Sequence, residues 1–179
     1  MRTPQLILLT LLFDITANTW AADGTITFKG AITGSTCTIT GNGTASKDFT
    51  VTLPTVAKGS LAVAGNTAGK TIFTIDLAAC TPTTGSVHAY FEAGANVDTT
   101  TNRLKLETTG TPATNVEIGL LNGDDTLIKL GLPDATQNSK PASLATGAAS
   151  LRYSAEYYAT GVATAGAANS SVMYTVILP

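Results

Sequence analysis

The sequence predicts an all-β protein, and three observations support that class. Only 12% of the 179 residues are charged, while threonine, valine, alanine and glycine are abundant and helix formers other than alanine are sparse. Apolar and polar residues alternate with period two over many short segments, which is typical of strands with one buried face. Glycine, asparagine, aspartate and proline separate these segments at regular spacing. Roughly seven to nine short strands in this arrangement predict a two-layer sandwich of the immunoglobulin-like class.

The chain begins with a segment that has the three parts of a secretory signal peptide. Arg2 supplies a positive charge, residues 6–13 form a short apolar run, and residues 19–21 fit a cleavage site of the small-x-Ala type. We therefore expect residues 1–21 to be removed on export, with a buried N-terminal helix as the alternative. The apolar run is too short to cross a bilayer as a helix, so the exported protein is not expected to be integral to a membrane.

Two alternating segments lie at the ends of the remaining chain, and neither has an obvious partner beside it in sequence. Residues 24–33 read Gly-Thr-Ile-Thr-Phe-Lys-Gly-Ala-Ile-Thr, and residues 172–179 read Val-Met-Tyr-Thr-Val-Ile-Leu-Pro. A terminal strand exposes main-chain N–H and C=O groups along one edge, and ordinary monomers protect such edges with charge. These segments carry almost no charge, which predicts that they pair with strands of other chains.

The strands between these ends follow from the same alternation and from turn residues at their boundaries. They are expected at residues 49–53, 71–79, 86–92, 104–107, 116–120, 126–130 and 151–158. A turn of sequence Asn-Gly-Asp-Asp at residues 122–125 predicts a hairpin between the fifth and sixth of these strands. Connecting loops are expected at residues 57–69, 94–102, 132–147 and 160–169.

Two cysteines, Cys37 and Cys80, remain after the signal segment. An even cysteine count in an oxidising compartment predicts one disulfide. Each cysteine lies on or at the end of a predicted strand, so the bond would link an early strand to a middle one. A reactive thiol pair is the alternative, but it would favour a closer spacing such as Cys-x-x-Cys.

No arrangement of residues in the sequence predicts catalysis, a metal site or a cofactor. His88 is the only histidine and has no nucleophile motif near it, so a solvent-facing strand position is expected. Asp124 and Asp125 belong to a turn and lack the spaced oxygen ligands of a calcium loop. The Gly-Asn-Gly turn at residues 41–43 is not followed by a P-loop lysine. A net charge of −2 provides no basic field for nucleic acid.

Four further features occur in order over the whole exported chain. They are the alternating run at residues 24–32, the cysteine pair, the run Tyr-Tyr-Ala-Thr-Gly-Val-Ala-Thr-Ala-Gly-Ala-Ala-Asn at residues 157–169, and the alternating C-terminal segment with Gly166 fourteenth from the end. Together they resemble the major subunits of chaperone–usher fimbriae, the type 1 pilin family. Leu178 departs from the family pattern, which usually has an aromatic residue next to last.

The resemblance implies a fold that lacks its final strand. The pilin domain at residues 34–179 would be an incomplete immunoglobulin-like β-sandwich, completed by donor-strand exchange. Residues 22–33 would form an N-terminal donor-strand extension that inserts into the groove of a neighbouring subunit. The donor-strand residues that would face the groove are Gly24, Ile26, Phe28, Gly30 and Ile32. The C-terminal strand at the groove edge, which a chaperone would also bind, would include Gly166, Tyr174, Val176 and Leu178.

The resemblance also implies the partners and the destination of the protein. The partners would be identical or related pilin subunits in a head-to-tail polymer, a periplasmic chaperone and an outer-membrane usher. The protein would be exported through the periplasm of a Gram-negative bacterium. It would then form an extracellular fimbrium on the cell surface that supports adhesion.

Three alternatives remain open from the sequence. Residues 24–33 could be the first strand of the protein's own sandwich. The protein could be a minor pilin, a tip adaptor or a carbohydrate-binding adhesin, although a two-domain tip adhesin would be nearly twice as long. A secreted β-sandwich enzyme is the third alternative, and the lack of catalytic motifs argues against it.

Overall fold

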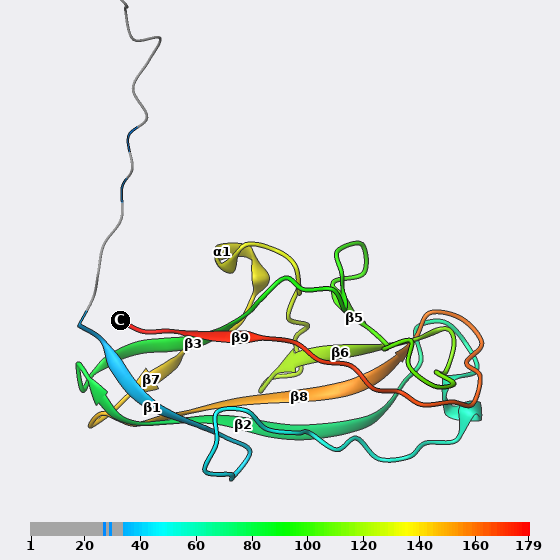
Figure 1. Cartoon of the computed structure of the whole chain (residues 1–179), viewed down its shortest axis with the longest axis horizontal. Coiled ribbons are helices and arrows are strands. Elements are labelled where there is room, and N and C mark those ends of the chain that lie inside the picture. The colour runs from blue at the N-terminus through cyan, green and yellow to red at the C-terminus, as the bar shows by residue number, and fades with distance from the viewer. Residues whose placement is uncertain (1–26, 28, 30–33) are drawn as a thin grey trace, which may run out of the picture. The chain divides into compact units, whose positions relative to one another are not determined.

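The computed structural model describes residues 34–179 together with Thr27 and Lys29, and the body from residue 34 onward consists of two antiparallel sheets (Figure 1). Its strands are β1 (Thr36–Gly41), β2 (Thr67–Thr81), β3 (Gly85–Phe91), β4 (Val97–Asp98), β5 (Arg103–Lys105), β6 (Val116–Asn122), β7 (Ala142–Leu144), β8 (Ala149–Ala159) and β9 (Tyr174–Ile177). The larger sheet has the order β1-β2-β8-β6-β5-β4, and the smaller has the order β7-β3-β9. This arrangement confirms the predicted all-β class.

Two single-turn helices interrupt the strands, η1 (Lys58–Leu61) and α1 (Asp134–Gln137). The loop predicted at residues 132–147 is therefore wrong in part, because it contains α1 and β7. The loop predicted at residues 94–102 likewise contains β4. These elements are too short for alternation to reveal them, and they form because β4 pairs with β5 and β7 with β3. None of the helices in the described part has the length and hydropathy needed to cross a membrane.

The long strands β2 and β8 form the centre of the larger sheet because their apolar residues are in register. Phe73 pairs with Tyr153, and Ile75 pairs with Leu151, so these side chains point to the same face. All four are buried. The rings of Phe91 and Tyr153 meet edge-on with centroids 5.3 Å apart, which joins this face to the smaller sheet. The core therefore lies between the two sheets.

The hairpin predicted after β6 forms only in part. Its turn closes with a hydrogen bond of 2.9 Å from Asn122 N–H to Thr126 O. The strand predicted at residues 126–130 is replaced by a single isolated bridge to β6. Ile128 and Leu130 turn inward in this segment and are 0% exposed. Burial of these two side chains, rather than a ladder, fixes the segment.

Strand β6 is buried on both faces, which includes the acidic residue Glu117. Glu117 lies on the outer face of the larger sheet, where the Thr101 hydroxyl donates a hydrogen bond to its Oε1 at 3.0 Å. Burial raises the pKa of the Glu117 carboxyl above its ordinary value. On the same sheet, the Arg103 guanidinium lies 3.6 Å from the centre of the Tyr158 ring. Alternation in β6 therefore identifies the inner face correctly, but the outer face is covered too.

Candidate functional site

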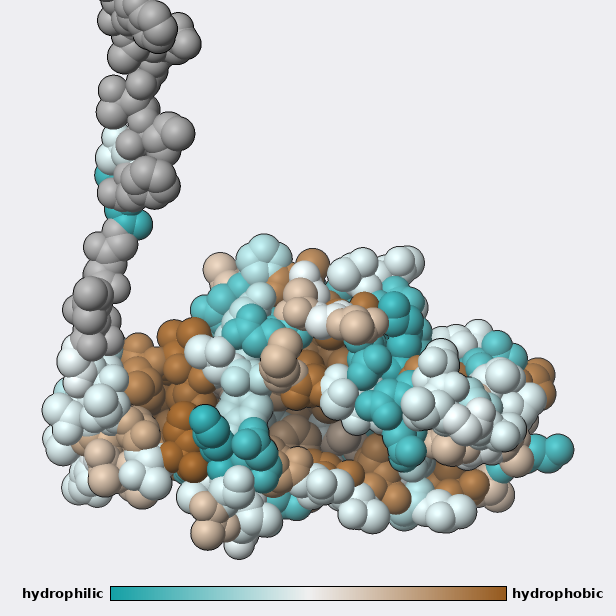
Figure 2. Space-filling model, viewed as in Figure 1, coloured by the Kyte–Doolittle hydropathy of each residue, from teal (hydrophilic) through white to brown (hydrophobic). Residues whose placement is uncertain are grey.

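A groove lies between β9 and the extended segment at residues 49–53, which follows β1 after a turn. It has a volume of about 820 Å³, and both sheets contribute to its floor. The floor residues are apolar and buried, and they are Phe73, Ile75, Phe91, Leu104, Ile118, Leu120 and Ala155. Figure 2 shows a hollow with hydrophobic (brown) side chains inside and hydrophilic (teal) side chains around it. The groove thus leaves core side chains uncovered that an adjacent strand would ordinarily cover.

The β9 wall of the groove presents main-chain groups to it. On its other edge β9 pairs with β3, and Glu92 N–H donates to Met173 O at 2.8 Å just before the strand. The main-chain groups of successive residues in an antiparallel strand point to opposite edges. Since Met173 points to β3, the N–H and C=O groups of Tyr174 and Val176 point to the groove. No strand in the described part of the chain pairs with them there.

The opposite wall is extended but forms no ladder. Phe49, Val51 and Leu53 are half-buried and line the groove, while Thr50 and Thr52 between them are exposed. The sequence predicts a strand here, and that prediction is wrong because no neighbouring strand is present to pair with it. Within residues 34–179, no main-chain hydrogen bond joins residues 49–56 to another part of the chain. The segment therefore has the alternation of a strand without a partner.

Tyr174 connects the two walls. Its hydroxyl donates a hydrogen bond to Lys47 O at 2.7 Å, and its ring meets the Phe49 ring edge-on with centroids 6.2 Å apart. Phe49 also packs against Phe73 of the floor, with centroids 6.1 Å apart. Burial raises the pKa of Tyr174, so its hydroxyl keeps its proton and can donate at neutral pH. Side-chain contacts thus hold the wall at residues 49–53 in place.

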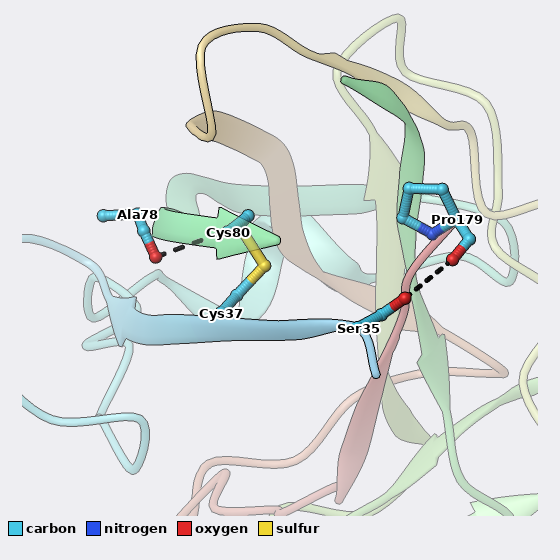
Figure 3. Close-up of a disulfide and its surroundings, with 5 residues drawn as sticks. All are labelled: Ser35, Cys37, Ala78, Cys80 and Pro179. Atoms are coloured by element: carbon cyan, nitrogen blue, oxygen red, sulfur yellow. Dashed lines mark hydrogen bonds between the residues drawn. A yellow bond between two sulfur atoms is a disulfide. The ribbon is translucent and has the colours of Figure 1, made fainter. Parts of the chain in front are cut away.

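The structure confirms the predicted disulfide, which joins Cys37 of β1 to Cys80 of β2 (Figure 3). The two cysteines are 43 residues apart in sequence. Near this bond, the Ser35 hydroxyl donates a hydrogen bond to Pro179 O at 2.9 Å. The start of β1 is therefore tied both to β2 and to the C-terminal residue that follows β9.

Three of the four residues predicted for the groove edge lie on or directly after β9. Tyr174 and Val176 line the groove. Leu178 follows the strand and is half-buried against the core. Gly166, by contrast, lies in the loop before β9 and does not line the groove. The structure therefore brings three of these residues together and places the fourth elsewhere.

Gly166 has a separate structural reason to be glycine. Beside it, Ala167 forms a parallel bridge with Pro112. A Cβ atom added at residue 166 would lie 2.4 Å from Ala113 N, which no side chain tolerates. Glycine permits the close approach of two backbones here. This contact fixes the loop from which the chain enters β9.

The predicted donor residues lie outside the described part of the chain. They are Gly24, Ile26, Phe28, Gly30 and Ile32, and the same holds for the signal segment at residues 1–21. Thr27 and Lys29 are described, and neither belongs to a strand. The role of this segment stays a prediction.

The described residues contain no cluster of three His, Cys, Asp or Glu side chains that could hold a metal ion. His88 lies on the outer face of β3, where α1 half covers it. Its Nε2 lies 2.8 Å from Asp134 Oδ1, so its contact is with the first residue of α1. This pair links α1 to β3 and has no nucleophile in it.

Sequence reasoning did not identify the groove floor as one surface, nor the contacts of Lys47 and Phe49. The floor residues lie on strands that were each predicted separately. A signal was nevertheless present, because the segments at residues 49–53 and 172–179 both alternate and neither has a neighbour in sequence. Two such segments in one sandwich indicate a gap between them.

Comparison with known proteins identifies similar chains of high coverage. A family model described as "Type-1 fimbrial protein, A" matches residues 53–179. The major fimbrial subunit SMF-1 of Stenotrophomonas maltophilia is 47% identical over 161 residues, which cover 88% of this chain and 93% of that protein. The F17 fimbrial protein of Escherichia coli is 46% identical over 181 residues, which cover 98% of each chain.

Solved structures share the fold at lower sequence identity. The P pilus rod subunit PapA matches with a TM-score of 0.58 and 18% identity, covering 79% of this chain and 97% of that chain. A chain from the structure of a chaperone–usher pilus matches with a TM-score of 0.59 and 17% identity, covering 88% and 96%. At these identities the likeness shows the fold alone.

Proposed function

The chain belongs to the type-1 fimbrial protein family of structural subunits of chaperone–usher pili, and from this premise we propose that it polymerises by donor-strand exchange. Residues 22–33 of one subunit, the donor segment, form a strand in the groove of the next subunit. The donor segment supplies the strand that lies between the two walls. The function is structural and involves no catalysis.

The observation that carries this proposal is that both walls are unpaired on the side of the groove. Tyr174 and Val176 direct main-chain groups into it, and residues 49–53 have no main-chain partner among the described residues. An extended peptide added to such an edge gains main-chain hydrogen bonds, and its alternate side chains set the register. One inserted strand would satisfy both walls at once.

The donor segment has side chains that suit the groove. Ile26, Phe28 and Ile32 lie on one face of the alternation and would contact the apolar floor. Gly24 and Gly30 lie on the same face, where the lack of a side chain lets the backbone approach closely. Burial of the three large side chains contributes about 5–8 kcal/mol before the cost of ordering the strand.

This mode of pairing produces a filament. Each subunit carries one donor segment and one groove, so contacts run head to tail and do not close on themselves. Before assembly, a periplasmic chaperone occupies the same groove with a strand of its own, and an outer-membrane usher catalyses the replacement. The signal segment at residues 1–21 directs export through the periplasm, and the fimbrium on the cell surface supports adhesion.

The test is deletion of residues 22–33 in the chain expressed together with its chaperone and usher. We expect the shortened protein to accumulate as a folded subunit bound to the chaperone, because its groove is intact. Electron microscopy should show no fibres, because no strand is available for the next groove. Fibres built from the shortened protein would show that the donor assignment is wrong.

A matched pair of full-length variants separates the donor role from chain length. Ile26→Asp with Phe28→Asp places two charges on the face that enters the groove, and we expect no fibres. Thr25→Asp with Thr27→Asp places the same charges on the opposite face, and we expect fibres to form. Equal behaviour of the two variants would contradict the proposed orientation of the donor strand.

A further inference from the structure

The smaller sheet has a second edge, on the side of β3 opposite β9. Strand β7 covers this edge only from Gly85 to Val87. Beyond Val87, the main-chain groups of Ala89 and Phe91 point to this side, because the residues between them pair with β9. No strand in the described part of the chain lies next to these two residues on this side.

Two buried side chains take the place of a strand there. Gln137 of α1 accepts a hydrogen bond from Phe91 N–H at its Oε1 and donates one from its Nε2 to Phe91 O, both at 2.8 Å. The Tyr153 hydroxyl accepts a hydrogen bond from Ala89 N–H at 3.2 Å. Gln137 is 0% exposed. A carboxamide offers a donor and an acceptor as a peptide group does, so Gln137 satisfies Phe91 as a neighbouring strand would.

The backbone around Gln137 is fixed on both sides. Lys129 N–H donates a hydrogen bond to Gln137 O at 2.7 Å. Asn138 adopts the left-handed conformation, with φ of 66°, and ends α1 directly after Gln137. At the other end of α1, Asp134 contacts His88 of β3 at 2.8 Å. The carboxamide is therefore held at the edge of β3 by more than its own two hydrogen bonds.

We propose that Gln137 is a specificity-determining residue for strand addition, because it closes this edge of β3 and confines an incoming strand to the β9 groove. The inference rests on the proposed function, since it concerns where a donor strand can pair. Without the carboxamide, the main-chain groups of Phe91 lose their partners, and the smaller sheet offers an edge on both sides. Open edges pair with whatever strand is available, so a protein that assembles through one edge must close the other.

The test counts the donor strands that one subunit binds. The subunit is the full chain with Ile26→Asp and Phe28→Asp, so that its own donor segment does not compete. The probe is a synthetic peptide with the native sequence of residues 22–33, present in excess during refolding. Native mass spectrometry then gives the number of peptides bound per chain. We expect one peptide on this subunit.

Substitution of Gln137 should change that number. With Gln137→Ala added, we expect two peptides per chain, one in the groove and one at the opened edge of β3. Thr136→Ala is the matched control, because its hydroxyl lies on the same turn of α1 and bonds only to Pro133 O. This control should bind one peptide.

Gln137→Glu tests the same idea without removing side-chain volume, which guards against a Gln137→Ala variant that does not fold. At about pH 4 and below, much of the glutamic acid is protonated and again offers a donor and an acceptor, so one peptide is expected. At neutral pH the carboxylate cannot donate to Phe91 O, and two peptides are expected. A purely structural role for Gln137 would change stability in these variants without changing the number of peptides bound.

The outcomes separate this inference from the proposed function. A single peptide on folded Gln137→Ala, or on Gln137→Glu at neutral pH, would overturn the role of Gln137 and leave the proposed function intact. If the subunit with native Gln137 binds no peptide, the proposed function fails, and this inference fails with it.

Discussion

The two walls of the groove are built in different ways, although one donor strand would have to pair with both. Strand β9 is held by a main-chain ladder to β3 that runs from the pair His88–Ile177 to the pair Phe91–Tyr174. The wall at residues 49–53 has no ladder among the described residues. Its position depends on side chains, chiefly the Phe49 ring and the hydroxyl that spans the groove.

This difference indicates an order of events during insertion. The main-chain groups of β9 are already aligned, so an incoming strand can pair with them without reorganising the subunit. The wall at residues 49–53 must still be ordered, and fixing the backbone costs about 1–2 kcal/mol per residue. We therefore expect β9 to act as the template and the other wall to gain most order when the groove is filled.

The largest effect should follow from loss of the disulfide, which anchors the less ordered wall. Cys37 lies on β1, the strand that leads into this wall, and its bond to Cys80 spans 43 residues. Chain-entropy arguments give such a loop about 4 kcal/mol. We expect the double change Cys37→Ser and Cys80→Ser to lower the free energy of unfolding by roughly this amount, measured by urea denaturation, and to lower the periplasmic yield.

The native protein under reducing conditions is the control for this prediction, since it loses the bond without a change of sequence. Hydrogen exchange should then show faster exchange at residues 49–53 than at β9. Unchanged stability without the disulfide, or equal loosening of both walls, would argue against an anchor that serves one wall.

The next effect concerns the β9 wall. Val176→Pro removes an N–H group that points to the groove, while the ladder to β3 uses the main-chain groups of Thr175 and Ile177. An unpaired acceptor on the donor strand costs about 1–3 kcal/mol, so we expect roughly tenfold to hundredfold weaker binding of a peptide of residues 22–33. Calorimetric titration of the refolded subunit measures this change.

Two neighbouring variants make that result specific. Val176→Ala shortens the side chain but keeps the N–H group, so its binding should fall less than that of the proline variant. Thr175→Pro removes an N–H group of the ladder to β3, so it should destabilise the subunit before any peptide is added. If the alanine and proline variants at residue 176 bind equally, β9 is not the template.

Much of the fold could be predicted from alternation, because a strand with one buried face shows its period over enough residues. Strands β2, β3, β6 and β8 were identified in this way. Strands β4 and β7 were missed, since two or three residues carry no period and such strands form only where a partner waits. The segment at residues 126–130 alternates but is fixed by burial of Ile128 and Leu130.

The candidate site was predictable to a similar extent. Tyr174 and Val176 follow from the alternation of the C-terminal segment, and Phe49, Val51 and Leu53 do share one face as predicted. Period two identifies the buried face of a segment, but it does not reveal whether a neighbouring strand exists. The role of Gln137 could not be predicted, because it depends on where β7 ends relative to β3.

The smallest effect should come from the single hydrogen bond that spans the groove. Tyr174→Phe keeps the ring against Phe49 and removes only the bond to Lys47 O. Such a bond contributes about 0.5–1.5 kcal/mol, and we expect the peptide of residues 22–33 to insert about two- to tenfold faster, because the walls separate more easily. Stopped-flow fluorescence with a labelled peptide measures the rate, and Tyr158→Phe on the outer face is the control. A slower rate in Tyr174→Phe would mean that this bond prepares the second wall for pairing, and the two walls would then be equally preformed.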